Sequence, residues 1–346
     1  MKIQFLVFIC AVVAVSGAED GGAVVPRDHN KDEYHRLCNL MKAAVTKWGD
    51  GGQGLSEPLK KALGRTLFGN DKGGDLGQLK GVLPSDYNDV EDTPDSRGLW
   101  CGDPREGDYI GQNQARWSGH SAPHDMVCLC TAGEKGWPVN RSETSTEKDK
   151  LCGQDRTALK AESNQGWGYT RHTGNAHVDA TWKATVTHCL DGDGKGEGLK
   201  VALGNFIEKL KPSPSRTYPS REQLGEGNAT DSDACSGSSA RGVCVMYYTN
   251  MKPTPWWKVL QEALIDDEKI QAEKRREEEE KRKQQEEERK TDESHEENIT
   301  SSETTTQGTE KNRIETLHEA IRKYNTTSGT PISLPSSWLL SAVFLF

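Results

Sequence analysis

Residues 30–49 read NKDEYHRLCNLMKAAVTKWG, and this stretch decides the fold class. Asn30 with Glu33 three residues later matches a capping box, and Gly49 ends the pattern. The stretch therefore predicts an amphipathic helix that must bury one face. That face is a stripe of apolar residues at helical spacing: Leu37, Leu40, Met41, Ala44, Val45 and Trp48.

Two further segments carry apolar residues at the same spacing and supply partners for that face. The first spans residues 56–69, with Pro58 tolerated in its first turn, and the second spans about 195–211 and ends before Pro212. Helices joined by a short turn bury such stripes against each other. The sequence therefore predicts a mainly α fold. We expect an elongated helical hairpin or bundle stem, a loop-rich, disulfide-stapled head lobe and a long charged C-terminal helix.

The charged helix is expected over residues 256–290. Between residues 271 and 289 nearly every residue is Glu, Lys, Arg or Gln, and many pair at i,i+4, each pair contributing roughly 0.2–0.5 kcal/mol. Such a helix would be about 52 Å long; the alternative is a disordered charged linker. Residues 291–328 are rich in Ser, Thr and Glu and predict a flexible spacer. The first turns keep an apolar face: Trp256, Trp257, Leu260, Leu264 and Ile265.

The cysteines indicate how the lobe between residues 70 and 194 is held together, since its apolar runs are short. An even number of cysteines in an exported chain predicts four disulfides, without fixing their pairing. Cys128 and Cys130 lie too close to bond each other, so each should join a different partner. Cys235 and Cys244 suit a small closed loop or a link to the lobe. Without Cys10 the cysteines are Cys38, Cys101, Cys128, Cys130, Cys152, Cys189, Cys235 and Cys244. Five tryptophans are expected to pack against the bridges: Trp100, Trp117, Trp137, Trp167 and Trp182.

Both ends of the chain read as processing signals. Residues 1–18 have the basic start, short apolar run and small-residue cleavage site of a signal peptide. Residues 329–346 end in an uncharged apolar tail behind small polar residues, as a glycosylphosphatidylinositol (GPI) attachment signal does. Ser328 is the predicted attachment residue, with Asn325 or Gly329 as alternatives; a buried C-terminal strand is the competing interpretation. The ectodomain is then residues 19–255.

Glycosylation sequons fit the same exported route. Asn140, Asn228 and Asn298 each begin an Asn-X-Ser/Thr sequon in a polar stretch and are predicted acceptors. A fourth sequon begins at Asn325, which lies too close to the expected lipid for ready use.

No pattern for catalysis or metal binding is complete. Asp191 begins a run like the start of an EF-hand loop, but the twelfth position is Ala202 rather than a bidentate acid. His120, His124, His172, His177 and His188 form no zinc motif, and no GxSxG elbow occurs. The formal net charge of −9 disfavours nucleic acid as a partner. We expect no catalytic residue, no metal and no cofactor.

Several residues together resemble a known family. Cys38 in the first helix, Cys101 after Trp100, the Cys128-Leu129-Cys130 node and the Trp256-Trp257 pair are similar to variant surface glycoproteins of African trypanosomes, of the congolense type. The resemblance implies a non-enzymatic homodimer on the outer leaflet of the plasma membrane, held by its GPI lipid. Packed copies would form a dense coat that shields the cell from host antibodies and complement and varies in sequence. The chain departs from well-known members in having no cysteine after Cys244.

The main alternative is a GPI-anchored receptor for a host serum protein or nutrient. Its interface would be tryptophans exposed in the lobe. A surface enzyme is the third and weakest candidate, because no catalytic constellation was found.

Overall fold

The computed structural model describes residues 25–91, 95–105, 115–140, 148–162, 165–168, 174–192, 196–228 and 234–300, with 89 and 291–300 described by backbone alone. By its contacts the chain divides into two units, Met1–Lys274 and Arg275–Phe346. The predicted signal peptide, Ser328 and the predicted attachment signal lie outside the described residues.

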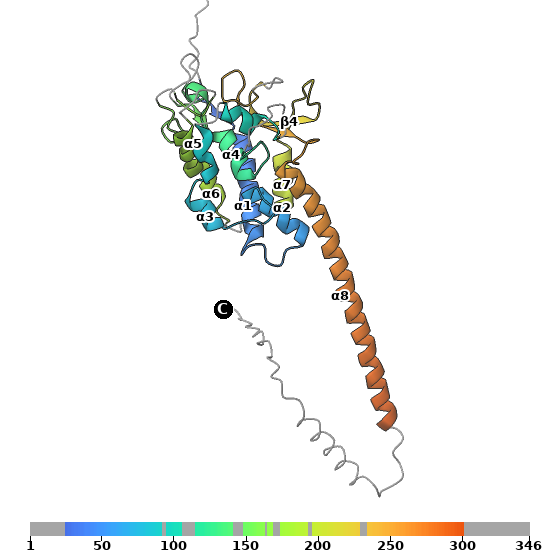
Figure 1. Ribbon diagram of the computed structural model, residues 1–346. Helices are drawn as coiled ribbons and strands as arrows, with labels where there is room; N and C mark the ends of the chain where they lie inside the picture. Colours follow the sequence, from blue (N-terminus) through green and yellow to red (C-terminus); the bar gives the residue numbers. More distant parts are fainter. Residues whose placement is uncertain are drawn as a thin grey trace, which may run out of the picture. The chain divides into compact units, whose positions relative to one another are not determined.

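Helix α1 (Lys31–Trp48) lies in the core of the first unit, where α2 (Glu57–Phe68), α4 (Ala122–Cys130), α6 (Thr187–Cys189) and α7 (Leu199–Ile207) pack around it (Figure 1). The predicted apolar stripes of α1 and α2 are buried, as expected. Gly49 and Gly69 are the C-caps of α1 and α2, so both predicted ends are confirmed.

The predicted capping box at Asn30 is wrong. Asn30 has left-handed backbone angles and makes no side-chain cap. Its buried amide instead donates to the carbonyls of Leu129 and Val243, at 2.9 and 2.8 Å, and its oxygen accepts from the Glu226 N–H at 2.8 Å. These three partners lie about 100 to 200 residues away in sequence, where a local motif cannot reveal them. Asn30 therefore joins the start of α1 to the middle of the lobe.

The lobe contains more helix than its composition predicts. The key helix is α4, where Ser121 accepts from the His124 N–H as N-cap and Pro123 lies in the first turn. Every residue of α4 is buried, so it lacks the amphipathic periodicity that marks a surface helix. Around it lie α3 (Leu76–Gly81), α5 (Asn175–Thr181), the 3-10 helices η1 (Ser85–Val90) and η3 (Glu134–Gly136), and the π-helices η2 (Gly98–Gly102) and η4 (Trp182–Val186).

Two small sheets were not predicted. Strands β3 (Lys211–Pro212), β4 (Arg221–Glu226) and β5 (Val243–Tyr248) form an antiparallel sheet in that order, with Arg221 opposite Tyr248 and Glu226 opposite Val243. Strand β1 (Asp28–His29) pairs in parallel with β2 (Lys150–Leu151). The helix predicted over about 195–211 is shorter in the structure. It corresponds to α7 (Leu199–Ile207), and Lys211 already belongs to β3.

Four disulfides join all eight cysteines that follow residue 18. They are Cys38–Cys189, Cys101–Cys128, Cys130–Cys152 and Cys235–Cys244. Cys128 and Cys130 have different partners, as predicted, because positions i and i+2 of a helix point to different sides. Helix α4 is therefore cross-linked to η2 on one side and to the segment after β2 on the other. Cys235–Cys244 closes a small loop at β5.

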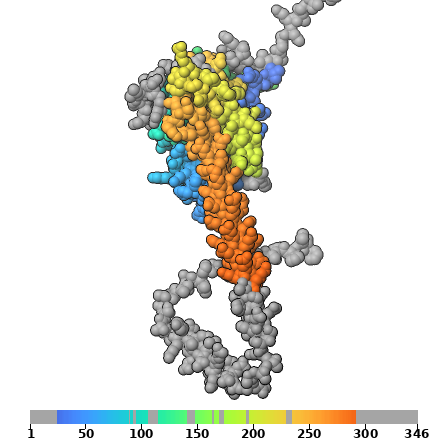
Figure 2. All heavy atoms as spheres, turned by 90° about the vertical axis from the view of Figure 1, so that its right-hand side faces the viewer, coloured from blue at the N-terminus to red at the C-terminus, as the bar shows by residue number. Residues whose placement is uncertain are grey.

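Helix α8 (Trp256–Thr300) begins in the first unit and continues into the second. Trp256, Trp257 and Leu260 are buried, and Lys200 pairs with Glu268 at 2.6 Å, which holds the first turns beside α7. Figure 2 shows those turns in orange next to the yellow-green surface of α7.

The predicted charged helix over residues 256–290 is confirmed, and the alternative of a disordered linker is excluded, because residues 271–290 are helical. Two other expectations about this region are wrong. The spacer expected to start at residue 291 is helical as far as Thr300, since Thr291–Thr300 contains no Gly or Pro to end the helix. Ile265, placed on the apolar face, is 51% exposed.

Candidate functional site

A buried carboxylate fastens the start of α8 to the lobe. Asp125 of α4 accepts hydrogen bonds from the Trp256 indole N–H at 2.6 Å, the Tyr247 hydroxyl at 2.9 Å and the Gly119 N–H at 3.0 Å. Burial raises the pKa of Asp125 to about 7, and the three hydrogen bonds act in the opposite direction. The three donors come from α8, β5 and the loop before α4, so the network is a structural junction.

His124, the neighbouring residue, is held neutral. Its ring contacts the Tyr87 hydroxyl at 2.8 Å and the Trp100 carbonyl oxygen at 3.1 Å. Burial, and then the positive charge of Arg116, lower its pKa to about 3. Arg116 lies over the Tyr87 ring at 4.7 Å. A neutral histidine with both ring nitrogens engaged packs the core and is poorly placed for proton transfer.

The tryptophans of the lobe are mostly inaccessible. Trp100, Trp137, Trp167 and Trp182 are at most 8% exposed. Trp117 is half-buried. The broad surface of exposed tryptophans expected for a receptor is therefore reduced to the neighbourhood of one residue.

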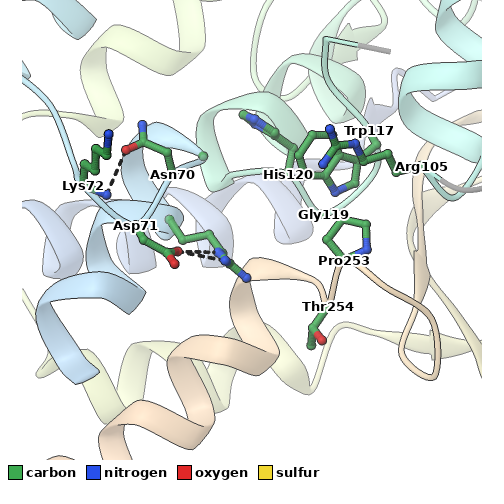
Figure 3. A pocket seen from close by; sticks show the side chains of 11 residues that line it. Asn70, Asp71, Lys72, Arg105, Trp117, Gly119, His120, Pro253 and Thr254 are labelled. Carbon is green, nitrogen blue, oxygen red and sulfur yellow. Dashed lines mark hydrogen bonds and ion pairs between the residues drawn. The ribbon is translucent and has the colours of Figure 1, made fainter. Parts of the chain in front are cut away.

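Trp117 lines a pocket of about 480 Å³ in the first unit (Figure 3). In this view Asn70, Asp71 and Lys72, which follow α2, lie on one side, and Trp117, His120 and Arg105 lie on the other. The complete lining is Arg65, Gly69, Asn70, Asp71, Lys72, Arg105, Trp117, Gly119, His120, Pro253 and Thr254. We call this the Trp117 pocket.

Aromatic contacts order one wall of the Trp117 pocket. The Arg105 guanidinium lies 4.5 Å from the centre of the Trp117 ring, and the His120 ring meets Trp117 edge-on at 4.4 Å. Burial, followed by the positive charge of Arg116, lowers the pKa of His120 well below its usual value. His120 is therefore neutral at physiological pH, and the positive charge of this wall comes from Arg105.

Gly69 is required where α2 meets this wall. Its φ of +77° is in the left-handed region that favours glycine. A Cβ atom at this position would overlap the His120 ring. The glycine that ends α2 thus permits the close approach of the 69–72 segment to His120.

Comparison with known proteins identifies the family of this chain. A family model described as the trypanosomal VSG domain matches residues 39–288, from within α1 to within α8. This chain belongs to that family. It is similar to the variant surface glycoprotein ILTAT 1.23 of Trypanosoma brucei brucei, with 29% identity over 164 residues, which cover 37% of this chain and 29% of that relative. The chain thus matches less than a third of the relative's length. Family membership supports a surface coat glycoprotein.

The histidines singled out in the sequence are dispersed through the VSG domain. His177 contacts the Leu159 carbonyl oxygen at 3.3 Å, and His188 contacts the Lys42 ammonium at 3.4 Å. His120 and His124 are neighbours, with ring centres 6.0 Å apart. No group of three or more His, Cys, Asp or Glu that could hold a metal occurs among the described residues. His172 lies outside them.

The predicted glycosylation sites lie in different settings. Asn140 is half-buried after η3, and Asn228 is exposed just after β4. Asn298 belongs to the backbone of α8. Their occupancy stays a prediction. In the described part of the VSG domain, no helix is both long and apolar enough to cross a membrane.

Proposed function

We propose that this VSG domain protein is a GPI-anchored coat glycoprotein of the outer leaflet of the plasma membrane. The observation that carries the proposal is the family match over residues 39–288, which includes most of the described elements. The terminal sequence patterns at 1–18 and 329–346 support export and lipid anchoring, with Ser328 as the attachment residue. As a homodimer in many copies, the protein shields the cell from host antibodies and complement, and its sequence differs between variants.

The architecture of the first unit suits a shielding role. Its buried core contains the four disulfides and most of its tryptophans, so substitutions of exposed residues are expected to cost little stability. The protein acts by covering a surface, and we assign it no catalytic step.

The experiment that tests this proposal is quantitative release from cells. Intact source cells are treated with phosphatidylinositol-specific phospholipase C, and released copies are counted by mass spectrometry. Release of this protein as the dominant surface species is the expected result. Failure to release it, while a control anchored protein is released, overturns the anchor. Mass spectrometry of the C-terminal peptide identifies the lipid-bearing residue.

A receptor is the second candidate, and the Trp117 pocket favours it. A receptor would be released by the same enzyme but would be scarce, because uptake does not require complete coverage of the surface. Copy number therefore separates the two functions.

A further inference from the structure

The Trp117 pocket carries positive charge in a chain whose formal net charge is −9. Three of its lining residues are cations: Arg65, Lys72 and Arg105. Its one acidic residue, Asp71, is already bound by Arg65, whose Nε and terminal nitrogen lie 2.9 and 2.8 Å from one Asp71 oxygen. Lys72 and Arg105 have no acidic partner among the described residues. Within the described part of the chain, the pocket thus has two positive charges that no acidic side chain neutralises.

The structure holds these two cations to different degrees. The Arg105 guanidinium stacks on Trp117, and a guanidinium held by its face keeps the N–H groups at its edge free to donate. Lys72 follows a turn in which its own N–H donates to the Asn70 side-chain oxygen at 3.0 Å. The Arg105 side chain is thus held in place, whereas at Lys72 the backbone is held and the side chain is exposed.

The rest of the lining is compact and partly apolar. Trp117, Pro253 and the backbone of Gly69 and Gly119 form it, and Thr254 accepts from Lys252 at 3.1 Å, which leaves the Thr254 hydroxyl hydrogen free to donate. A volume of about 480 Å³ falls in the range that holds small organic molecules, roughly 300–1,000 Å³. Cations at the edge and an aromatic ring within suit a molecule with one charged and one apolar end.

We propose that the Trp117 pocket binds a small organic anion, with its carboxylate or phosphate group on Arg105 and its compact apolar body against Trp117 and Pro253, while Lys72 adds positive charge on the opposite side of the pocket. Charge-assisted hydrogen bonds from a guanidinium to a carboxylate or phosphate are among the stronger polar contacts in proteins. This site is independent of the coat role, and a coat protein that carries it has a second, binding function.

The test uses tryptophan quenching on the intact, disulfide-bonded chain. Trp117 is the one half-exposed tryptophan in the described part of the chain, so the quenchable fluorescence is expected to come mainly from it; Trp117→Phe identifies that signal. Iodide, an anion, should quench it more strongly than caesium. Phenyl phosphate and benzoate should each protect it at lower concentration than inorganic phosphate.

The decisive variant is the double substitution Lys72→Ala with Arg105→Gln. It should weaken protection by phenyl phosphate and benzoate at least ten-fold and lower the ratio of iodide to caesium quenching. Lys150→Ala, which removes an exposed lysine of β2, is the matched control and should change neither. Unchanged thermal midpoints verify folding.

Three results overturn the proposal. The first is no protection of the wild type by either organic anion. The second is equal protection in the wild type and the double variant. The third is protection by inorganic phosphate as strong as by phenyl phosphate, which removes the apolar end of the ligand. If phenyl phosphate protects the wild type and benzoate does not, the site is specific for a phosphate group, and the proposal is supported.

Discussion

The first unit and the second half of α8 hold their structure in opposite ways. In the first unit, α1 and α4 are packed on most sides, four disulfides are buried, and polar side chains such as Asp125 are satisfied inside. Between Glu273 and Lys290 of α8 every side chain is exposed. The former depends on contacts between residues far apart in sequence, and the latter on helix propensity and charges one turn apart. The two regions should therefore respond to different perturbations.

The largest effect is expected from the disulfide that closes the longest loop. Replacing both Cys38 and Cys189 by Ser frees a loop with a sequence separation of 151 residues, which the loop-entropy relation values at about 5 kcal/mol. The same relation gives about 3 kcal/mol for Cys235–Cys244, with a separation of 9. Guanidinium unfolding followed by tryptophan fluorescence measures both, because every tryptophan between residues 19 and 328 lies before residue 258.

The ordering of the two double variants is the test. If removal of Cys235–Cys244 costs more than removal of Cys38–Cys189, the first unit is held by local geometry at β5 rather than by its long-range cross-link. The far-ultraviolet signal of α8 should survive in both variants, which keeps the two regions distinct.

An intermediate effect is expected at Asp125. Asp125→Asn places the side-chain NH₂ group opposite one of the groups that donate a hydrogen bond to the carboxylate. A buried donor left without an acceptor costs about 1–3 kcal/mol of unfolding free energy. Asp266→Asn, at an exposed position of α8, is the matched control and should stay within about 0.5 kcal/mol of the wild type. Tryptophan-detected unfolding at pH 7 measures the difference.

The pH dependence of the same variant gives a sharper result. Because the pKa of Asp125 is raised from 3.8 to about 7, its protonation stabilises the folded state below pH 3.8, and this contribution is lost as the pH rises through 7. The advantage of the wild type over Asp125→Asn should thus be larger at pH 5 than at pH 8. His124 acts in the other direction: its pKa is lowered to about 3, so its contribution is present above pH 6.5 and is lost on acidification. A difference between wild type and variant that does not change with pH contradicts the raised pKa.

The smallest effect is expected in the charged part of α8. Replacing Lys281, Arg282 and Lys283 by Gln removes their i,i+4 partners for Glu277, Glu278 and Glu279, at roughly 0.2–0.5 kcal/mol for each pair. The helical signal at 222 nm should fall, while the tryptophan-detected midpoint should not move. Sodium chloride at about 1 M should reproduce the change in the wild type, since it screens charges beyond about 3 Å. A shift of the midpoint would mean that the charged segment supports the first unit.

The sequence predicted the elements whose signal is local. Stripes at helical spacing located α1 and α2, and Gly49 and Gly69 marked their ends. It did not locate α4, because a helix buried on all sides has no polar face to set a period. Strand β5 reads Val-Cys-Val-Met-Tyr-Tyr, and its β-branched and aromatic residues were an available signal that the Ser- and Gly-rich surroundings obscured.

The same distinction between local and long-range signals applies to the disulfides and to the Trp117 pocket. Cysteine number predicted four disulfides, and the adjacency of Cys128 and Cys130 predicted separate partners. The Trp117 pocket could not be predicted, because Lys72, Arg105 and Pro253 come from three segments that only the fold brings together. The burial of the other lobe tryptophans also depends on tertiary packing. The number of tryptophans in the sequence therefore suggested a larger exposed aromatic surface than the structure has.

The order of the disulfides along the chain has a consequence for limited proteolysis. The Cys38–Cys189 bond encloses two of the other three, so a single peptide-bond cleavage between these cysteines leaves every fragment covalently attached. Between Cys189 and Cys235 no bridge crosses the chain. One cut there, for example in the exposed residues after β4, would separate the cross-linked N-terminal portion from β5 and α8 once the non-covalent contacts are lost. A protease therefore meets one covalently unprotected stretch between two protected ones.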